Sequence, residues 1–160
     1  MKKLMLFCIA IMGCTLAMQA QEKNAIGLRL GDSDGFGTEV SYQRYISEKN
    51  RLEFDLGWRS SSNFDAFRLT GLYQWVWNID GGFNWYAGAG GGIAQVDFDT
   101  IPAGNDDSDT YLYAAGDIGI EYDFEIPLLI SLDFRPEFGF SDILDDDIDF
   151  DIAFSIRYQF

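Results

Sequence analysis

The chain has 160 residues, enough for one domain with a sizeable core and too few for two ordinary domains. Its 26 acidic residues outnumber 11 basic ones, and a net charge of −15 excludes nucleic-acid binding through clustered Lys and Arg. Aromatic residues make up 16% of the chain, which excludes a disordered acidic protein.

Residues 1–20 have the layout of a cleavable secretory signal peptide. Lys2 and Lys3 form the positive start, and an apolar run follows from Leu4 to Leu16. That run is too short for a transmembrane helix, which needs about 20 residues. Ala20 is a small residue suited to the cleavage point, so we expect the mature protein to begin directly after it.

Both cysteines, Cys8 and Cys14, lie inside this segment. The mature domain, residues 21–160, is therefore predicted to have no disulfide and no cysteine metal site. A lipoprotein cleavage box that ends at Cys14 is an alternative interpretation, although Met12 fits such a box poorly.

The region after the signal peptide alternates apolar and polar residues with a period of two, which is typical of β-strands. Most of the segments approach the 9–11 residues that a tilted membrane strand needs. No apolar run of 18 residues occurs after the signal peptide, so a membrane-embedded form of this domain must be a closed barrel. The predicted strands cover residues 25–31, 36–46, 51–59, 67–79, 83–98, 111–122, 128–140 and 148–160.

The fifth of these segments is rich in glycine at its centre. Gly88, Gly90, Gly91 and Gly92 precede a slip in the alternation near Ile93. The slip predicts a bulge or tight bend there, and the glycines let strands bend or pack closely in the barrel wall.

The connections between the segments alternate in length. Three are short, and four are mostly longer and rich in Asp, Ser, Gly and Asn, as in outer-membrane barrels. The short ones cover residues 47–50, 80–82 and 123–127; the others cover 31–35, 60–64, 100–109 and 141–147.

Large aromatic residues gather near the ends of the predicted strands. Such residues form girdles at the two surfaces of a membrane. A soluble barrel with aromatic core residues is the alternative. The predicted membrane-interface aromatics are Tyr42, Trp58, Trp75, Trp77, Trp85, Tyr122, Tyr158 and Phe160.

The signal peptide, the eight alternating segments and the final Ser155-Ile156-Arg157-Tyr158-Gln159-Phe160 resemble the small OmpA/OmpX-type outer-membrane barrels. The resemblance implies an all-β fold: an eight-stranded antiparallel up-and-down transmembrane barrel in the outer membrane, exported through the periplasm. A terminal strand that ends in Phe is similar to that family's assembly signal, so barrel-insertion machinery and outer-membrane lipid are the expected partners. We expect a monomer. The family is functionally diverse, so the resemblance implies the cellular location more than the molecular function.

The polar face of the strands carries both signs of charge, and a lumen this narrow is filled by side chains. We expect a network in which Arg135 meets Asp133, Glu137 and Asp117, and in which Arg29 meets Glu39, since unpaired buried charges are costly. The network is interpreted as a structural plug or as a gate in a narrow water path. The predicted interior residues are Arg29, Glu39, Glu53, Asp55, Arg68, Asp117, Glu121, Asp133, Arg135, Glu137 and Arg157.

The loops add further carboxylates, at residues 31–35, 105–109 and 142–149. Residues 31–35 look like the start of a calcium loop but lack the later acidic ligand. Divalent cations that bridge these loops to anionic lipid headgroups are one interpretation, and a solvated loop surface is the other.

The chain contains no histidine, whereas the barrel enzymes of this class rely on histidine as base or relay. We therefore predict a non-enzymatic outer-membrane protein with no cofactor, a closed polar interior and a structural or surface-interaction role. A narrow pore or conduit for small solutes or hydrophobic ligands is the first alternative. A soluble periplasmic calycin-like binding protein, with its apolar face inward, is the second.

Overall fold

The computed structural model describes residues 24–31, 37–60, 64–98, 108–140 and 148–160, which form eight strands. No helix in these ranges is long and apolar enough to cross a membrane. The strands are β1 (Asn24–Leu30), β2 (Thr38–Tyr45), β3 (Asn50–Ser60), β4 (Phe64–Asp80), β5 (Phe83–Phe98), β6 (Ser108–Asp123), β7 (Leu128–Gly139) and β8 (Ile148–Gln159).

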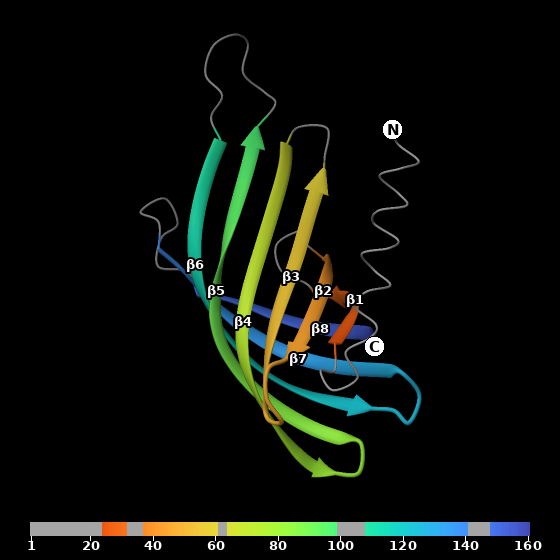
Figure 1. Ribbon diagram of the computed structural model, residues 1–160. Coiled ribbons are helices and arrows are strands. Elements are labelled where there is room, and N and C mark those ends of the chain that lie inside the picture. The colour runs from red at the N-terminus through yellow and green to blue at the C-terminus, as the bar shows by residue number, and fades with distance from the viewer. Residues whose placement is uncertain (1–23, 32–36, 61–63, 99–107, 141–147) are drawn as a thin grey trace, which may run out of the picture.

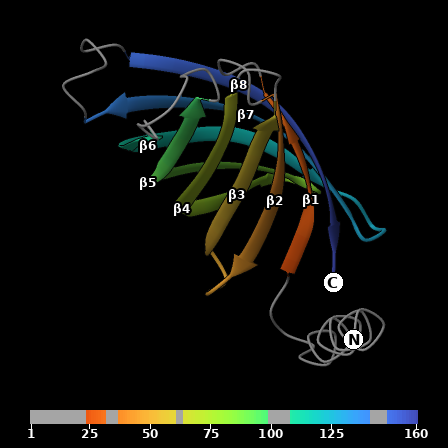
Figure 2. The same cartoon turned by 90° about the horizontal axis from the view of Figure 1, so that it is seen from above.

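The strands form one closed barrel with simple up-and-down order (Figure 1). Each strand pairs antiparallel with its neighbours in sequence, and β1 pairs with β8 to close the sheet. Figure 2 shows β8 returning alongside β1. The predicted all-β, eight-stranded antiparallel barrel is confirmed, and each predicted strand lies within three residues of an observed one.

The two ends of the barrel differ. The connections over residues 46–49, 81–82 and 124–127 share one end with both described chain ends, where the backbones of Asn24 and Phe160 bond to each other. Gly81 closes the two-residue turn between β4 and β5 with a φ of 54°, in the left-handed region that favours glycine. We call this the short-turn end and the opposite one the loop end.

Strand length is uneven around the barrel. β4 has 17 residues, and β5 and β6 have 16 each, whereas β1 has 7 and β2 has 8. At the loop end, β3 to β6 therefore rise beyond β1 and β2 (Figure 1). We call the rising part the sheet extension; it comprises residues 58–60, 64–67, 95–98 and 108–110, which pair with one another across four strands.

The predicted bulge near Ile93 is wrong. Ile93 pairs with Leu69 and with Leu112 in unbroken register, and the ladder between β4 and β5 shifts instead between Asn78 and Asp80. Glycine and alanine occupy both faces of β5 here, so the sequence loses its apolar–polar contrast while the strand itself continues.

The glycines of the wall leave space for inward-facing tyrosines. A Cβ on Gly92 would stand 2.3 Å from the hydroxyl oxygen of Tyr113, and one on Gly119 would stand 2.4 Å from that of Tyr86. Both rings therefore lie against backbone that has no side chain. The predicted close packing in the wall holds between backbone and tyrosine rings.

The barrel is polar inside and apolar outside. Its buried residues are mainly Arg, Asp, Glu, Gln, Ser and Thr. In the described part of the chain, the buried apolar cluster comprises Leu72, Ala94, Tyr113 and Ala115. Large apolar side chains on the outward face stay exposed, among them Ile152 at 60%. A soluble domain has the opposite arrangement, with apolar residues buried and polar residues exposed. The polar groups of this barrel are therefore concentrated in its lumen.

Candidate functional site

The lumen holds all the residues predicted to form the interior polar network. Each of these eleven side chains belongs to a residue that is no more than 7% exposed. Alternation explains the placement, because successive side chains of a strand point to opposite faces. The inner face of β3, for example, presents Glu53 and Asp55, while Phe54 between them faces outward.

Arg29 on β1 binds carboxylates from three strands. Its Nη1 donates to Glu39 Oε2 at 3.1 Å and to Asp151 Oδ2 at 2.6 Å, and its Nη2 donates to Asp133 Oδ1 at 2.5 Å. The expected Arg29–Glu39 pair is present. Charge-assisted bonds of this kind are roughly twice as strong as neutral ones, so Arg29 ties β1 to β2, β7 and β8.

Glu53 is the most connected carboxylate of the lumen. It accepts from Arg135 Nη2 at 3.0 Å, from Arg157 Nη2 at 3.3 Å and from Gln43 Nε2 at 2.5 Å. Arg135 also donates to Asp55 Oδ2 at 2.7 Å. The centre of the network therefore joins β7 and β8 to β3 across the lumen.

The direct ion pairs of Arg135 differ from the predicted ones, although Asp117 and Asp133 are still close enough to act on its charge. Asp133 binds Arg29, Glu137 binds Arg68, and Asp117 accepts from Gln74. A long arginine side chain stands roughly perpendicular to the wall, so in a narrow barrel it reaches the far side more readily than its own strand.

Arg51 was missing from the predicted set. It is fully buried, donates to Glu121 Oε2 at 2.6 Å and to Gln74 Oε1 at 2.5 Å, and lies over the Tyr86 ring at 4.6 Å. Its position two residues before Glu53 on the same face was the available signal. Arg51 closes the lumen near the short-turn end.

A second layer lies near the loop end. Arg68 Nε donates to the hydroxyl of Tyr113 at 3.0 Å, while its Nη2 binds Glu137. The Tyr113 hydroxyl also bonds to Thr70 Oγ1 at 2.5 Å. Tyr113 and Thr70 were not predicted, because uncharged residues in a strand do not indicate by themselves which ion pair they support.

The interior charges do not balance. The buried residues of the described chain include five arginines and eight carboxylates. Several of their atoms have no hydrogen-bond partner within the protein, including Asp117 Oδ1 and Arg135 Nε. Buried polar groups of this kind are commonly satisfied by ordered water. No set of three or more Asp, Glu, His or Cys in the described chain is arranged to hold a metal ion.

The predicted interface aromatics lie on the outward face or at its edge. Exposure is 64% for Trp58, 44% for Trp75, 37% for Trp77, 40% for Trp85, 58% for Tyr158 and 40% for Phe160, while Tyr42 and Tyr122 are half-buried. Trp77 stacks on Trp85 with ring centroids 4.3 Å apart, and Phe83 and Tyr122 meet edge to face. These contacts form part of a belt around the short-turn end.

Solved structures share this architecture. The N-terminal β-barrel domain of Pseudomonas aeruginosa OprF matches with a TM-score of 0.62 and 12% identity over 87% of this chain and 96% of that one. Neisserial surface protein A matches with a TM-score of 0.62 and 13% identity over 87% and 96%. Ail, the attachment invasion locus protein of Yersinia pestis, matches with a TM-score of 0.58 and 17% identity over 87% and 97%.

The fold is that of the small outer-membrane β-barrels. No family model matches the chain, and no curated protein matches it significantly. An apolar outward face around a charged lumen is stable where the wall contacts lipid, so fold and surface are those of an outer-membrane protein. The soluble calycin-like alternative requires the apolar face inward and is wrong on this geometry.

Several predictions lie outside the described residues. They are the signal peptide and its cleavage point, and most of the acidic residues proposed to bridge divalent cations at residues 32–34, 105–107 and 142–147.

Proposed function

We propose that this outer-membrane barrel is a non-enzymatic surface-interaction protein, closed along its lumen, which contacts its partner through the sheet extension at the loop end. In barrels of this fold the longer connections face the outside of the cell. The extension would then stand at the cell surface.

The observation that supports this proposal is the edge of β6 at residues 108–110, beyond the described ladder between β6 and β7. Pairing between β6 and β7 begins at Tyr113 opposite Gly139, with one further bond from Phe140 N to Leu112 O at 3.1 Å. Among the described residues, the ladder between β6 and β7 does not extend to positions 108–110. Unpaired strand edges bind extended segments of other proteins through their main chain, and neighbouring side chains add specificity.

The closed lumen supports the same interpretation. Each of the five buried arginines is bonded to a carboxylate, so moving solute through the barrel would require separating buried ion pairs. Ail, which shares the fold, is an attachment invasion locus protein. The fold is therefore compatible with a role in interactions at the cell surface.

Site-specific photo-cross-linking in intact cells tests the proposal. A photoreactive residue at Thr110, exposed on the extension, should give adducts with a partner, and the same residue at Ile118, outward on the lower part of β6, should not. Equal yields of adducts at Thr110 and Ile118 would contradict the proposal. The absence of any adduct at Thr110 would contradict it as well.

A narrow water or ion path is the second candidate. It is favoured by the unpartnered polar atoms of the lumen, which include Glu39 Oε1, Gln43 Oε1 and Asp55 Oδ1. Single-channel conductance of the refolded chain in a planar bilayer separates the candidates, with a heat-shift gel as the folding control. A silent, folded barrel supports closure, whereas discrete conductance steps support the path.

A further inference from the structure

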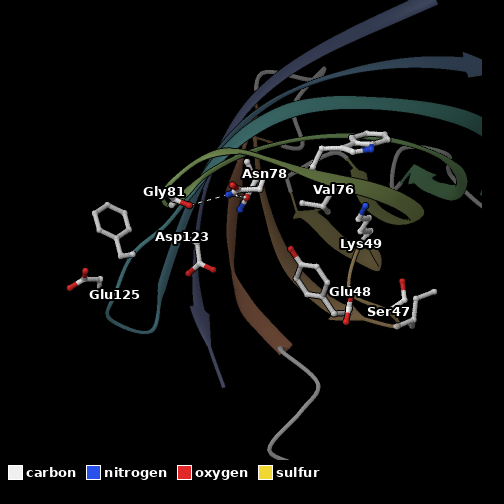
Figure 3. A pocket seen from close by; sticks show the side chains of 14 residues that line it. Ser47, Glu48, Lys49, Val76, Asn78, Gly81, Asp123 and Glu125 are labelled. Atoms are coloured by element: carbon white, nitrogen blue, oxygen red, sulfur yellow. Dashed lines mark hydrogen bonds between the residues drawn. The ribbon is translucent and has the colours of Figure 1, made fainter.

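A vestibule opens at the short-turn end, where the lumen meets the three short turns (Figure 3). Its volume is about 1070 Å³, at the upper end of the size of small-molecule sites. The turns contribute Glu48, Lys49 and Glu125, and the strand ends contribute Asn78, Asn84 and Asp123.

The vestibule is closed at its inner end. Tyr45, which lines it, accepts a long hydrogen bond from Arg51 Nη1 at 3.4 Å, and Asn84 donates to Glu121 Oε1 at 3.4 Å. Arg51 and Glu121 are themselves an ion pair at 2.6 Å. A molecule that enters from the short-turn side would therefore meet a floor and would be retained rather than passed on.

One wall of the vestibule is held in place by Asn78. Its Nδ2 lies within hydrogen-bond distance of the carbonyl oxygens of Gly81 and Phe83, at 3.0 and 3.2 Å, and of Asn84 Oδ1, at 2.9 Å. The register shift between Asn78 and Asp80 lies at the same place. Strand irregularities often re-aim side chains next to binding sites, and a pre-formed wall lowers the entropy lost on binding.

The lining has acidic and apolar parts. Three of the lining residues, Glu48, Asp123 and Glu125, are acidic, and one, Lys49, is basic. The remaining surface includes Tyr45 and Val76. Figure 3 shows Glu48 on the turn between β2 and β3, on the other side of the opening from Asp123 and Glu125, which lie at the end of β6 and in the turn after it. Charge complementarity therefore favours a cationic occupant with several charges spaced along an extended backbone and with apolar groups between them.

We infer that the vestibule binds a basic, extended peptide segment of a partner protein on the short-turn side of the membrane. Lysine or arginine side chains would pair with the carboxylates of the two acidic turns, and alternate apolar side chains would contact Tyr45 and Val76. The site is separate from the sheet extension, which lies at the opposite end of the barrel.

Fluorescence anisotropy with a labelled Lys-Leu-Lys-Leu-Lys peptide and the folded chain in lipid nanodiscs tests this inference. We expect saturable binding, and none for Glu-Leu-Glu-Leu-Glu. The double variant Asp123→Asn/Glu125→Gln should weaken binding roughly three- to thirtyfold, from the loss of two ion pairs near the surface. The matched control Asp65→Asn/Asp149→Asn removes two charges near the loop end and should change affinity less than about twofold.

Equal weakening by the two double variants would overturn the inference, because it would show attraction to net charge alone. So would the absence of saturable binding by a barrel that a heat-shift gel shows to be folded.

A charge reversal gives a second measurement that misfolding cannot imitate. The variant Asp123→Lys/Glu125→Lys should lose the basic peptide and acquire saturable binding of the acidic one. A reversed variant that binds neither peptide while folded would contradict the inference. Spermidine that displaces the basic peptide at equal concentration would also overturn it, because the site would then recognise small polycations rather than a peptide.

Discussion

The inner and outer faces of the same strands obey opposite rules. On β8, Ser155 and Arg157 face the lumen and are almost fully buried, whereas Phe154, Ile156 and Tyr158 face outward with 42–58% of their surface exposed. The inner face is stabilised by directional bonds between charges. The stability of the outer face depends on contact with lipid, which solvates apolar side chains. The same alternation thus specifies two different kinds of stability.

The largest effect is expected on the inner face. Arg29→Met removes bonds to Glu39, Asp133 and Asp151 and leaves three buried carboxylates without this partner. Breaking a buried ion pair costs about 3–5 kcal/mol, so the unfolding free energy in lipid vesicles should fall by that amount. Urea titration followed by tryptophan fluorescence measures it. Lys49→Met in an exposed turn is the control, and an equal response of the two variants would mean that the lumen is solvated.

On the outer face the expected effect is slightly smaller. Leu132 is 50% exposed on β7, between Ile120 and Phe154 of the neighbouring strands. Leu132→Arg places a charge against lipid and should cost about 2–4 kcal/mol in the same titration. Ile126→Arg, in the turn between β6 and β7, should cost less than about 0.5 kcal/mol. If Leu132→Arg proved harmless, this part of the wall would not contact lipid.

The two faces also differ at their glycines. A Cβ at Gly92 would meet the Tyr113 hydroxyl at 2.3 Å and the Leu69 carbonyl at 2.4 Å, whereas at outward-facing Gly71 the Phe54 ring lies at 3.6 Å. Gly92→Ala should therefore lower the unfolding free energy by about 1–3 kcal/mol, as overpacking does. Gly71→Ala should change it by no more than about 0.5 kcal/mol. The reverse order would show that Tyr113 does not lie against this wall.

The smallest effect concerns the outward aromatic belt. Trp77 and Trp85 stack with ring centroids 4.3 Å apart and an angle of 19°. A double-mutant cycle with Trp77→Ala and Trp85→Ala should give a coupling of about 0.5–1.5 kcal/mol. Strictly additive losses would show that each ring contacts lipid independently.

Alternation made the barrel predictable from the sequence. Period-two patterns located all eight strands, because each strand separates one lipid-facing set from one lumen-facing set. The pattern failed at residues 88–93, where glycine and alanine carry no contrast between faces. The alternation also identified most of the residues that face the lumen, because charged residues separated by an even number of positions on a strand lie on the same face.

The pairing inside the lumen was less predictable. Arg29 and Glu39 lie directly opposite each other on adjacent strands, so that pair followed from local register. Arg135 pairs with Glu53 and Asp55 across the lumen, and that depends on the stagger and diameter of the closed barrel. Neither the stagger nor the diameter can be predicted from the sequence of a single strand. The vestibule likewise arises from three turns that are distant in sequence.

The central claim, a lumen of buried charge inside a lipid-facing wall, is tested most directly by a spin-label scan along β8. Single cysteines at each position from 151 to 157, in a chain without Cys8 and Cys14, report collision with oxygen in lipid and with a water-soluble nickel complex. The account predicts that labels at 152, 154 and 156 meet oxygen and that labels at 151, 153, 155 and 157 do not. Nickel collisions at 152, 154 and 156 in place of oxygen collisions would contradict it, because the outward wall would then face water.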